Sequence, residues 1–294
     1  MNLSIAHLGP PGTYAEQVTL FYADWLKQNT EVAATATLCP YPSIAQTLKA
    51  VAKGEVSLGI VPVENLIEGG VTMTLDTIWG LENLKIHLAL VMPIVHTLIS
   101  CAENLGKIQI VYSHPQALAQ CQGWLEQFLP KVQLISTNST TEALSSLSQD
   151  STAAAISGAR AAQINDLPII ANGINDYSEN CTRFWVVSAN TPPELCLPKK
   201  TKNSHTSLAF SLPANLPGAL VKALEIFANL EINLSRIESR PTKRSLGEYL
   251  FFIDLEADAN LPQMQSALLE LASYTEVLRI LGSYNVLYTD SLGD

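Results

Sequence analysis

The strongest constraint in the sequence is an alternation of short apolar runs with segments of helical periodicity, which continues to about residue 188. The first unit is the run SIAHL, the turn Gly9-Pro-Pro-Gly12 and a helical segment from Thr13 to about Lys27, with Thr13 as its candidate N-cap. Later apolar runs are ATLCPY, VSLGIVPVEN, KIQIVYSH, KVQLIS and AAAIS, and helical segments such as TTEALSSLSQ follow them. This alternation predicts an α/β fold with parallel sheets covered by helices.

The texture of the sequence changes around residues 81–106, which predicts two α/β lobes joined by a hinge. We assign residues 1–80 with 181–190 to the first lobe and residues 81–180 to the second. Ligands of such folds bind beyond the carboxyl ends of the strands, often in the cleft between lobes.

A different organisation follows. Residues 191–204, TPPELCLPKKTKNS, contain three prolines and three lysines and lack periodicity, so they predict a linker. Residues 205–294 then read as strand, helix, two strands, helix and strand, which is the ferredoxin-like β-α-β-β-α-β order.

The composition excludes several classes of function. The formal net charge is -10, which disfavours nucleic acid and anionic membranes as partners and requires local positive potential for an anionic substrate. The longest apolar stretch, residues 88–102, is interrupted by Pro93 and His96 and is too short to span a bilayer. The start lacks the features of a signal peptide, and five widely spaced cysteines are typical of reduced cytosolic thiols. We therefore expect a cytoplasmic protein.

The glycine-rich turn does not predict a nucleotide site. It lacks the Lys-Ser/Thr ending of a P-loop and the G-x-G-x-x-G pattern of a dinucleotide fold, although its N–H groups at a helix N-terminus could contact an anion. The histidines are scattered without metal-ligand spacing, so we expect no metal site.

Polar motifs remain at the ends of several predicted strands. Taken singly they have ordinary explanations: Asn65 could close a turn, Ser113 could cap the next helix, and Arg183 could be a surface charge. Taken together they predict a small-anion site built from one arginine, hydroxyls and amides, without a strong base. The residues alone do not specify the reaction. The motifs are Glu64-Asn65, Ser113-His114 with Gln120, and Asn180-Cys-Thr-Arg-Phe184 before the short strand WVVS.

The motifs GPPGTY, PVENLIEGGV, SHPQALAQC, NCTRF, GALV and LSRIESRP, in this order, resemble the prephenate dehydratase family over essentially the whole chain. This resemblance implies conversion of prephenate to phenylpyruvate, with loss of the ring carboxylate as CO2 and of the ring hydroxyl as water, and no cofactor. It also implies a two-lobed catalytic domain similar to periplasmic binding proteins and a C-terminal domain similar to ACT regulatory domains.

The resemblance implies roles for single residues. Thr182 would be the catalytic hydroxyl, which donates a hydrogen bond to the departing ring hydroxyl. Arg183 would hold a substrate carboxylate in its planar fork, and Phe184 completes the motif. The residues implied in substrate binding are Asn65, Ser113 and Gln120, flanked by Glu64 and His114, with Thr13 at the first helix.

In the C-terminal domain the resemblance implies a phenylalanine site between ACT domains, and hence a homodimer or homotetramer. Its residues would be Gly218, Ala219 and Leu220 with Glu238, Ser239, Arg240 and Pro241. Leu66 and Gly70 depart from the family pattern, which usually has a small hydroxyl residue at the first position and frequently has a serine at the second. Two alternatives stay open: an arogenate dehydratase, and a non-catalytic amino-acid sensor.

Overall fold

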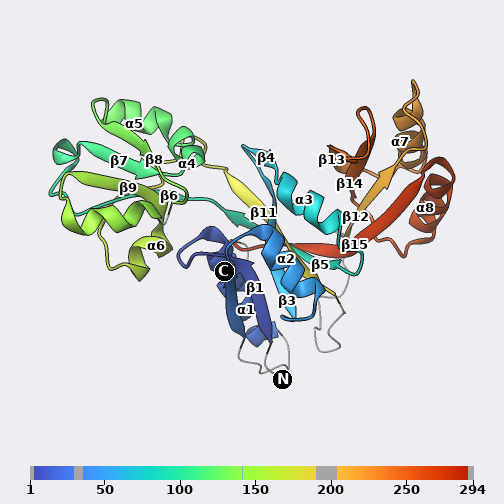
Figure 1. The fold of residues 1–294 in the computed structure, drawn as a ribbon, viewed down its shortest axis with the longest axis horizontal. Coiled ribbons are helices and arrows are strands. Elements are labelled where there is room, and N and C mark those ends of the chain that lie inside the picture. Colours follow the sequence, from blue (N-terminus) through green and yellow to red (C-terminus); the bar gives the residue numbers. More distant parts are fainter. Residues whose placement is uncertain (1–2, 30–35, 141, 190–203, 291–294) are drawn as a thin grey trace.

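The computed structural model describes residues 3–29, 36–140, 142–189 and 204–290. Within these ranges the chain forms two sheets, one of ten strands and one of five (Figure 1). The predicted linker at residues 191–204 lies outside the described residues, apart from Ser204.

The first lobe contains the strand–helix alternation expected from the sequence. Its elements are β1 (Ser4–Leu8), α1 (Tyr14–Asn29), β2 (Thr37–Tyr41), α2 (Ile44–Ala52), β3 (Leu58–Asn65), β4 (Gly69–Gly70) and α3 (Thr72–Trp79). Strands β1, β2 and β3 are parallel, and α1 packs on one face through Val18 and Tyr22. Helices α2 and α3 pack on the other face through Leu48 and Ile78.

Strands β5 (Lys85–Pro93) and β11 (Cys181–Ser188) extend this sheet in antiparallel order, β11 lying between β5 and β3. The assignment of residues 81–180 to the second lobe is therefore wrong for β5. Leu88, Ala89 and Leu90 are fully buried, so this stretch shows no alternation that could have indicated its sheet.

The second lobe has the strand order β10-β6-β9-β7-β8. Its strands are β6 (His96–Ser100), β7 (Ile110–Ser113), β8 (Gln133–Ser136), β9 (Ala153–Gly158) and β10 (Ile169–Asn172). Its helices are η1 (Leu105–Lys107), α4 (Pro115–Ala119), α5 (Gln122–Phe128), η2 (Glu142–Gln149) and α6 (Ala159–Ile164). The segment predicted as a helix over TTEALSSLSQ contains η2, which is a 3-10 helix. The chain crosses between the lobes twice, and the crossings are joined because Ile94 donates its N–H to the Asn180 carbonyl at 2.8 Å.

The C-terminal domain confirms the β-α-β-β-α-β order. Its elements are β12 (Ser204–Ser211), α7 (Ala219–Asn229), β13 (Leu234–Pro241), β14 (Tyr249–Leu255), α8 (Pro262–Tyr274) and β15 (Val277–Tyr288). Helices α7 and α8 cover one face of its four strands, around Phe210 and Phe227. The other face packs on the first lobe, where Phe252 and Tyr284 join the cluster of Ile78.

The long strand β15 joins the strands of the C-terminal domain to those of the first lobe, so that they form one ten-stranded sheet. It pairs with β12 from Val277 onward and, from Asn285 to Tyr288, runs parallel to β5 (Figure 1). Gly282 lies at the crossing, where a Cβ would overlap the carbonyl oxygen of Ile86. The C-terminal domain is thus joined to the first lobe by backbone pairing as well as by side chains.

Candidate functional site

Asn65 and Thr182 lie directly opposite each other on β3 and β11. The Asn65 amide Nδ2 lies 3.0 Å from Thr182 Oγ1, 2.9 Å from Asn180 Oδ1 and 3.2 Å from the Cys181 carbonyl oxygen, so its two N–H groups serve three acceptors. The Asn65 Oδ1 accepts the backbone N–H groups of Ile67 and Glu68, both at 3.1 Å. Asn65 therefore closes a turn, as its position suggested, and also orients the Thr182 hydroxyl.

Gln120, the C-cap of α4 in the second lobe, joins this pair through Asn180. Its Oε1 accepts a hydrogen bond from Asn180 Nδ2 at 3.0 Å and lies 3.0 Å from His96 Nε2. Its Nε2 donates to Glu68 Oε1 at 3.3 Å. Three of the predicted residues, Asn65, Gln120 and Thr182, are thus gathered into one polar network that links both lobes.

Tyr14 and His96 extend the network and were not predicted. The Tyr14 hydroxyl lies 3.1 Å from His96 Nδ1 and donates to the Val95 carbonyl at 2.9 Å. Burial lowers the pKa of His96, and its hydrogen bond to Gln120 offsets part of this shift. Burial also raises the pKa of Tyr14. Tyr14 and Asn180 lie in the motifs GPPGTY and NCTRF, which could have indicated them as site residues. His96 is a single histidine in an apolar run, and nothing in the sequence around it indicates a functional site.

A cavity of about 410 Å³ opens beside this network. It is lined by Leu66 and Ile67, which follow Asn65, and by residues 176–179, which precede Asn180. Leu66 is 60% exposed and Tyr177 is 65% exposed, so its rim offers apolar surface to a ligand.

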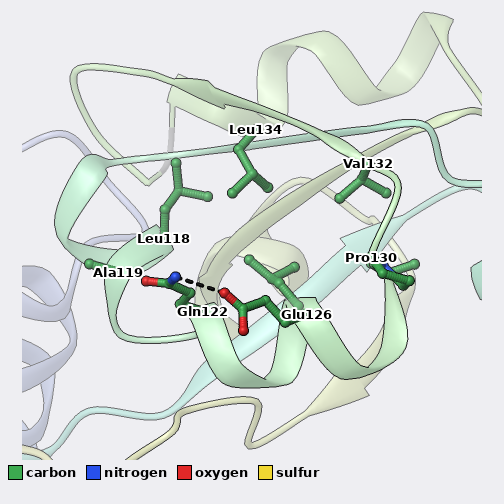
Figure 2. Close-up of a pocket in the computed structure, with 9 residues that line it drawn as sticks. Leu118, Ala119, Gln122, Glu126, Pro130, Val132 and Leu134 are labelled. Atoms are coloured by element: carbon green, nitrogen blue, oxygen red, sulfur yellow. Dashed lines mark hydrogen bonds between the residues drawn. The ribbon is translucent and has the colours of Figure 1, made fainter.

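A second cavity, of about 380 Å³, lies in the second lobe between α4, α5 and β8 (Figure 2). Its walls are mainly aliphatic, from Leu118, Val132 and Leu134, and its carboxylate Glu126 accepts a hydrogen bond from Gln122 at 2.8 Å. Thr182 and Asn65 are not among its walls, so it does not belong to the polar network.

The structure does not bring Arg183 to the side of Thr182. The Thr-Arg-Phe motif lies inside β11 rather than before it, and successive side chains of a strand point to opposite faces. Arg183 Nη1 lies 3.4 Å from Glu64 Oε2 and 3.5 Å from Asp254 Oδ2 of the C-terminal domain. Glu64 is on that face for the same reason, because it precedes Asn65 on β3.

Phe184, Ser113 and His114 contact other parts of the chain. Phe184 is 2% exposed and packs in the core beneath α1. The buried Ser113 hydroxyl donates to the Ile156 carbonyl at 2.7 Å. The cap that Ser113 could have supplied comes from His114, whose Nδ1 accepts the Gln116 N–H at 3.3 Å.

The N-terminus of α1 is occupied by a carboxylate of the chain itself. Thr13 caps the helix by accepting the Glu16 N–H at 3.3 Å, and Glu16 Oε2 accepts the Gly12 N–H at 2.7 Å. This differs from a capping box in that the glutamate accepts the N–H of the residue before the N-cap. Arg160 of the second lobe also lies 3.4 Å from Glu16. An anion at this helix terminus would therefore have to displace Glu16.

The residues predicted for an effector fall on both faces of the C-terminal sheet. Gly218, with φ 78°, is the N-cap of α7, and Ala219 and Leu220 begin its first turn on the helix-covered face. Glu238 and Arg240 face the first lobe, where Arg240 pairs with Asp76 at 2.8 Å. Ser239, between Glu238 and Arg240, and Pro241, after Arg240, are exposed.

The described ranges contain no group of three or more histidine, cysteine, aspartate or glutamate side chains placed to hold a metal ion. None of their helices has the length and hydrophobicity required to cross a bilayer.

Two known family models match the chain over the regions that contain these motifs. The family model of prephenate dehydratase matches residues 5–192, and that of the ACT domain matches residues 206–273. Prephenate dehydratase of Lactococcus lactis subsp. cremoris is 38% identical over 97% of this chain and 98% of its own. That of Methanocaldococcus jannaschii is 34% identical over 97% and 99%, respectively.

Solved structures agree with this comparison. Prephenate dehydratase of Arthrobacter aurescens, in complex with L-Phe, superposes with a TM-score of 0.82 at 34% identity, over 96% of this chain and 90% of its own. GqqA, described as a quorum-quenching acylase, has a TM-score of 0.78 at 27% identity, over 96% and 98%. A closely similar fold thus carries more than one reported activity, and the choice between activities rests on the site.

Proposed function

Because this chain belongs to the prephenate dehydratase family, we propose that it converts prephenate to phenylpyruvate, with release of CO2 and water. The observation that carries this proposal is the hydrogen bond from the Asn65 amide to Thr182 Oγ1, at 3.0 Å. The amide occupies the acceptor side of the hydroxyl oxygen and leaves its proton free for another acceptor. The ring hydroxyl of the substrate is the acceptor that an elimination requires.

A hydroxyl of ordinary acidity suffices for this reaction. Loss of CO2 and water makes the ring aromatic, so the main requirement is to stabilise the leaving oxygen as its bond breaks. Thr182 is 8% exposed, and a hydrogen bond donated in such a water-poor place is stronger than one made in bulk water.

The same geometry disfavours nucleophilic catalysis by Thr182. The hydrogen-bond partner of its oxygen is an amide rather than an imidazole or a carboxylate, and an amide does not remove a proton. The thiol of Cys121, which follows Gln120 in the chain, is not an alternative nucleophile, because burial, with a contribution from the charge of Asp176, raises its pKa to about 12. Transfer of a hydrogen bond to a leaving group fits this site better than covalent acyl transfer.

Substrate binding follows from the same network. Asn65, Asn180 and Gln120 present amides on the Thr182 side, and the cavity beside Leu66 and Tyr177 offers apolar surface for a ring. We propose that these groups orient the substrate, whereas Ser113 and His114 stabilise the second lobe. Arg183 would contact a substrate carboxylate only after leaving Glu64 and Asp254.

Regulation by phenylalanine is part of this proposal. An ACT domain is present in the chain, and the related Arthrobacter aurescens enzyme contains L-Phe. We propose that phenylalanine binds between ACT domains of two subunits, near Gly218 and Glu238, in a cytoplasmic homodimer or homotetramer. It would act by favouring one arrangement of the oligomer.

The test is product formation by the purified chain from prephenate and, separately, from arogenate, with and without phenylalanine. Phenylpyruvate from prephenate, suppressed by phenylalanine, is the expected result. Turnover of arogenate alone would keep the chemistry and change the substrate. No reaction with either, in folded protein that binds phenylalanine, would support the sensor; hydrolysis of acylated amines instead would support an acylase.

A further inference from the structure

Arg183 and Thr182 are adjacent on β11 but serve different faces of the sheet. Thr182 faces the polar network of the two lobes, whereas Arg183 faces strands β13 and β14 of the C-terminal domain. Arg183 is half-buried, and its Nε is buried without a hydrogen-bond partner among the described residues. A guanidinium in this position must be held by nearby carboxylates, because burying an unpaired charge is costly.

Asp254 of β14 is the carboxylate at the centre of this interface. Its side chain is 1% exposed, and its Oδ2 lies 2.8 Å from Arg236 Nε and 3.5 Å from Arg183 Nη1. The Ser207 hydroxyl donates to its other oxygen at 2.5 Å. One buried carboxylate thus serves two guanidinium groups, one from each domain. Removing it leaves both charges short of a partner.

The next residue on this face of β11, Trp185, is held by the same cluster. The guanidinium of Arg236 lies over the Trp185 ring, 5.5 Å from its centroid. Arg183 and Trp185 therefore attach β11 to the C-terminal domain at two successive positions, and Thr182 lies beside the first of them. A cation–π contact and an ion pair are both sensitive to small shifts of the strand that carries them.

The cluster continues to the residues proposed to bind the effector. Arg236, Glu238 and Arg240 occupy every second position of β13 and therefore lie on one face of the strand. Arg236 Nη1 lies 3.4 Å from Glu238 Oε2. Glu238 also lies against Gly70 of β4, where a Cβ would overlap its carboxylate. Burial raises the pKa of Glu238, and the charges of Arg236 and Arg240 offset part of this shift. If the ammonium group of a ligand paired with Glu238, Arg236 would lose one of its partners. The ion pair between Arg236 and Asp254 would then change.

From this geometry we propose that Arg183 is a positioning residue for Thr182, held by Asp254 of the C-terminal domain. The catalytic site is then complete only when that domain is docked, and the Glu238–Arg236–Asp254–Arg183 series carries the state of the effector site to β11. The inference rests on the proposed function, because its readout is turnover of prephenate.

The first measurement is steady-state turnover of prephenate by wild type, Asp254→Asn and Arg183→Gln, together with the thermal unfolding midpoint of each. We expect kcat to fall roughly 10- to 100-fold in both variants with little change in KM, because a displaced catalytic group weakens transition-state contacts more than substrate binding. A substrate-binding role for Arg183 gives the opposite pattern, a raised KM in Arg183→Gln and no effect in Asp254→Asn, and would overturn the proposal.

The double variant separates positioning from general destabilisation. If the two residues act as one unit, Arg183→Gln with Asp254→Asn loses no more kcat than either single change, whereas independent effects multiply. Multiplying effects would contradict the proposal. Arg244→Gln is the matched control, because Arg244 is in the same domain and pairs with Glu276 at 2.7 Å on the surface. It should leave kcat unchanged.

Two outcomes need a further variant or baseline. If Asp254→Asn does not fold, Glu64→Gln removes the other carboxylate beside Arg183, 32% exposed, and should still lower kcat. An unchanged kcat in folded Glu64→Gln and Arg183→Gln would overturn the proposal. Failure of wild type to convert prephenate is a separate result, which rejects the proposed function before any variant is compared.

Discussion

The Asn65 amide and the Thr182 hydroxyl face each other across paired strands, with 3.0 Å between Nδ2 and Oγ1. The pairing of β3 with β11 places these two side chains opposite each other, so the orientation of the Thr182 hydroxyl depends on the sheet.

Asn65→Asp tests the donor. The introduced carboxylate keeps an oxygen for the N–H groups of Ile67 and Glu68 but replaces the donor to Thr182 with an acceptor. The Thr182 proton would then point to this carboxylate rather than to the substrate. We expect kcat to fall about 10²- to 10³-fold, the usual loss for one oriented donor, in protein with a normal circular dichroism spectrum. A kcat within twofold of wild type would remove Asn65 from the mechanism.

Gln120→Leu tests the link between lobes. It removes the acceptor for Asn180 and leaves a buried donor unpaired, so the free energy of unfolding should fall by about 1–3 kcal/mol. We also expect kcat/KM to fall about tenfold or more, because Asn180 then positions Asn65 less well. Gln122→Leu, two residues away on the exposed side of α5, is the control and should change stability by no more than about 0.5 kcal/mol. Equal kcat/KM in the two variants would contradict this role.

Asp76 of the first lobe pairs with Arg240 of the C-terminal domain, and the stability that this ion pair contributes should depend on pH. Hydrogen bonds from Arg240 lower the pKa of Asp76 to about 2 despite partial burial, with a further contribution from Lys243; Glu238 is the nearby like charge. The unfolded state therefore binds more protons between pH about 4 and about 2, and the stabilisation is present above this window and lost as pH falls through it.

Asp76→Asn should accordingly lower the unfolding midpoint at pH 7, and the gap to wild type should close between pH about 4 and about 2. Asp24→Asn, which breaks the exposed pair with Lys27 at 2.8 Å, should have little effect at any pH. A gap for Asp76→Asn that is independent of pH would contradict the assignment.

Gly70→Ser tests the contact between Glu238 and β4. The added side chain overlaps the Glu238 carboxylate, which must move because it is the flexible partner. If Glu238 is freed for a ligand ammonium, the concentration of phenylalanine that halves the rate should fall by about threefold or more. An unchanged inhibition curve would show that the effector does not compete with this contact.

Much of the fold could be predicted because the strands and helices follow the periodicities that the sequence displays. Strand β5 was assigned to the wrong lobe because both of its faces are buried and its neighbour β15 comes almost at the end of the chain. The hydrophobic pattern within β5 does not indicate that it pairs with a strand so distant in the sequence.

The site could be predicted in part. Asn65, Gln120 and Thr182 lie together as expected, although they come from different kinds of position: Asn65 ends β3, Thr182 is near the start of β11, and Gln120 is the C-cap of α4. Arg183 was placed with Thr182 because the motif was taken to precede its strand. Once the motif is inside β11, alternation directs Arg183 to the opposite face, and its partner Asp254 lies 71 residues away.

The central claim is that the Thr182 hydroxyl donates to the departing ring hydroxyl. The most direct test compares the rate of phenylpyruvate formation from prephenate by Thr182→Val, which keeps the shape, and Thr182→Ser, which keeps the hydroxyl. We predict that Thr182→Val loses about 10²-fold or more of kcat while remaining folded, and that Thr182→Ser stays within about tenfold of wild type. A folded Thr182→Val variant with full turnover would contradict the account.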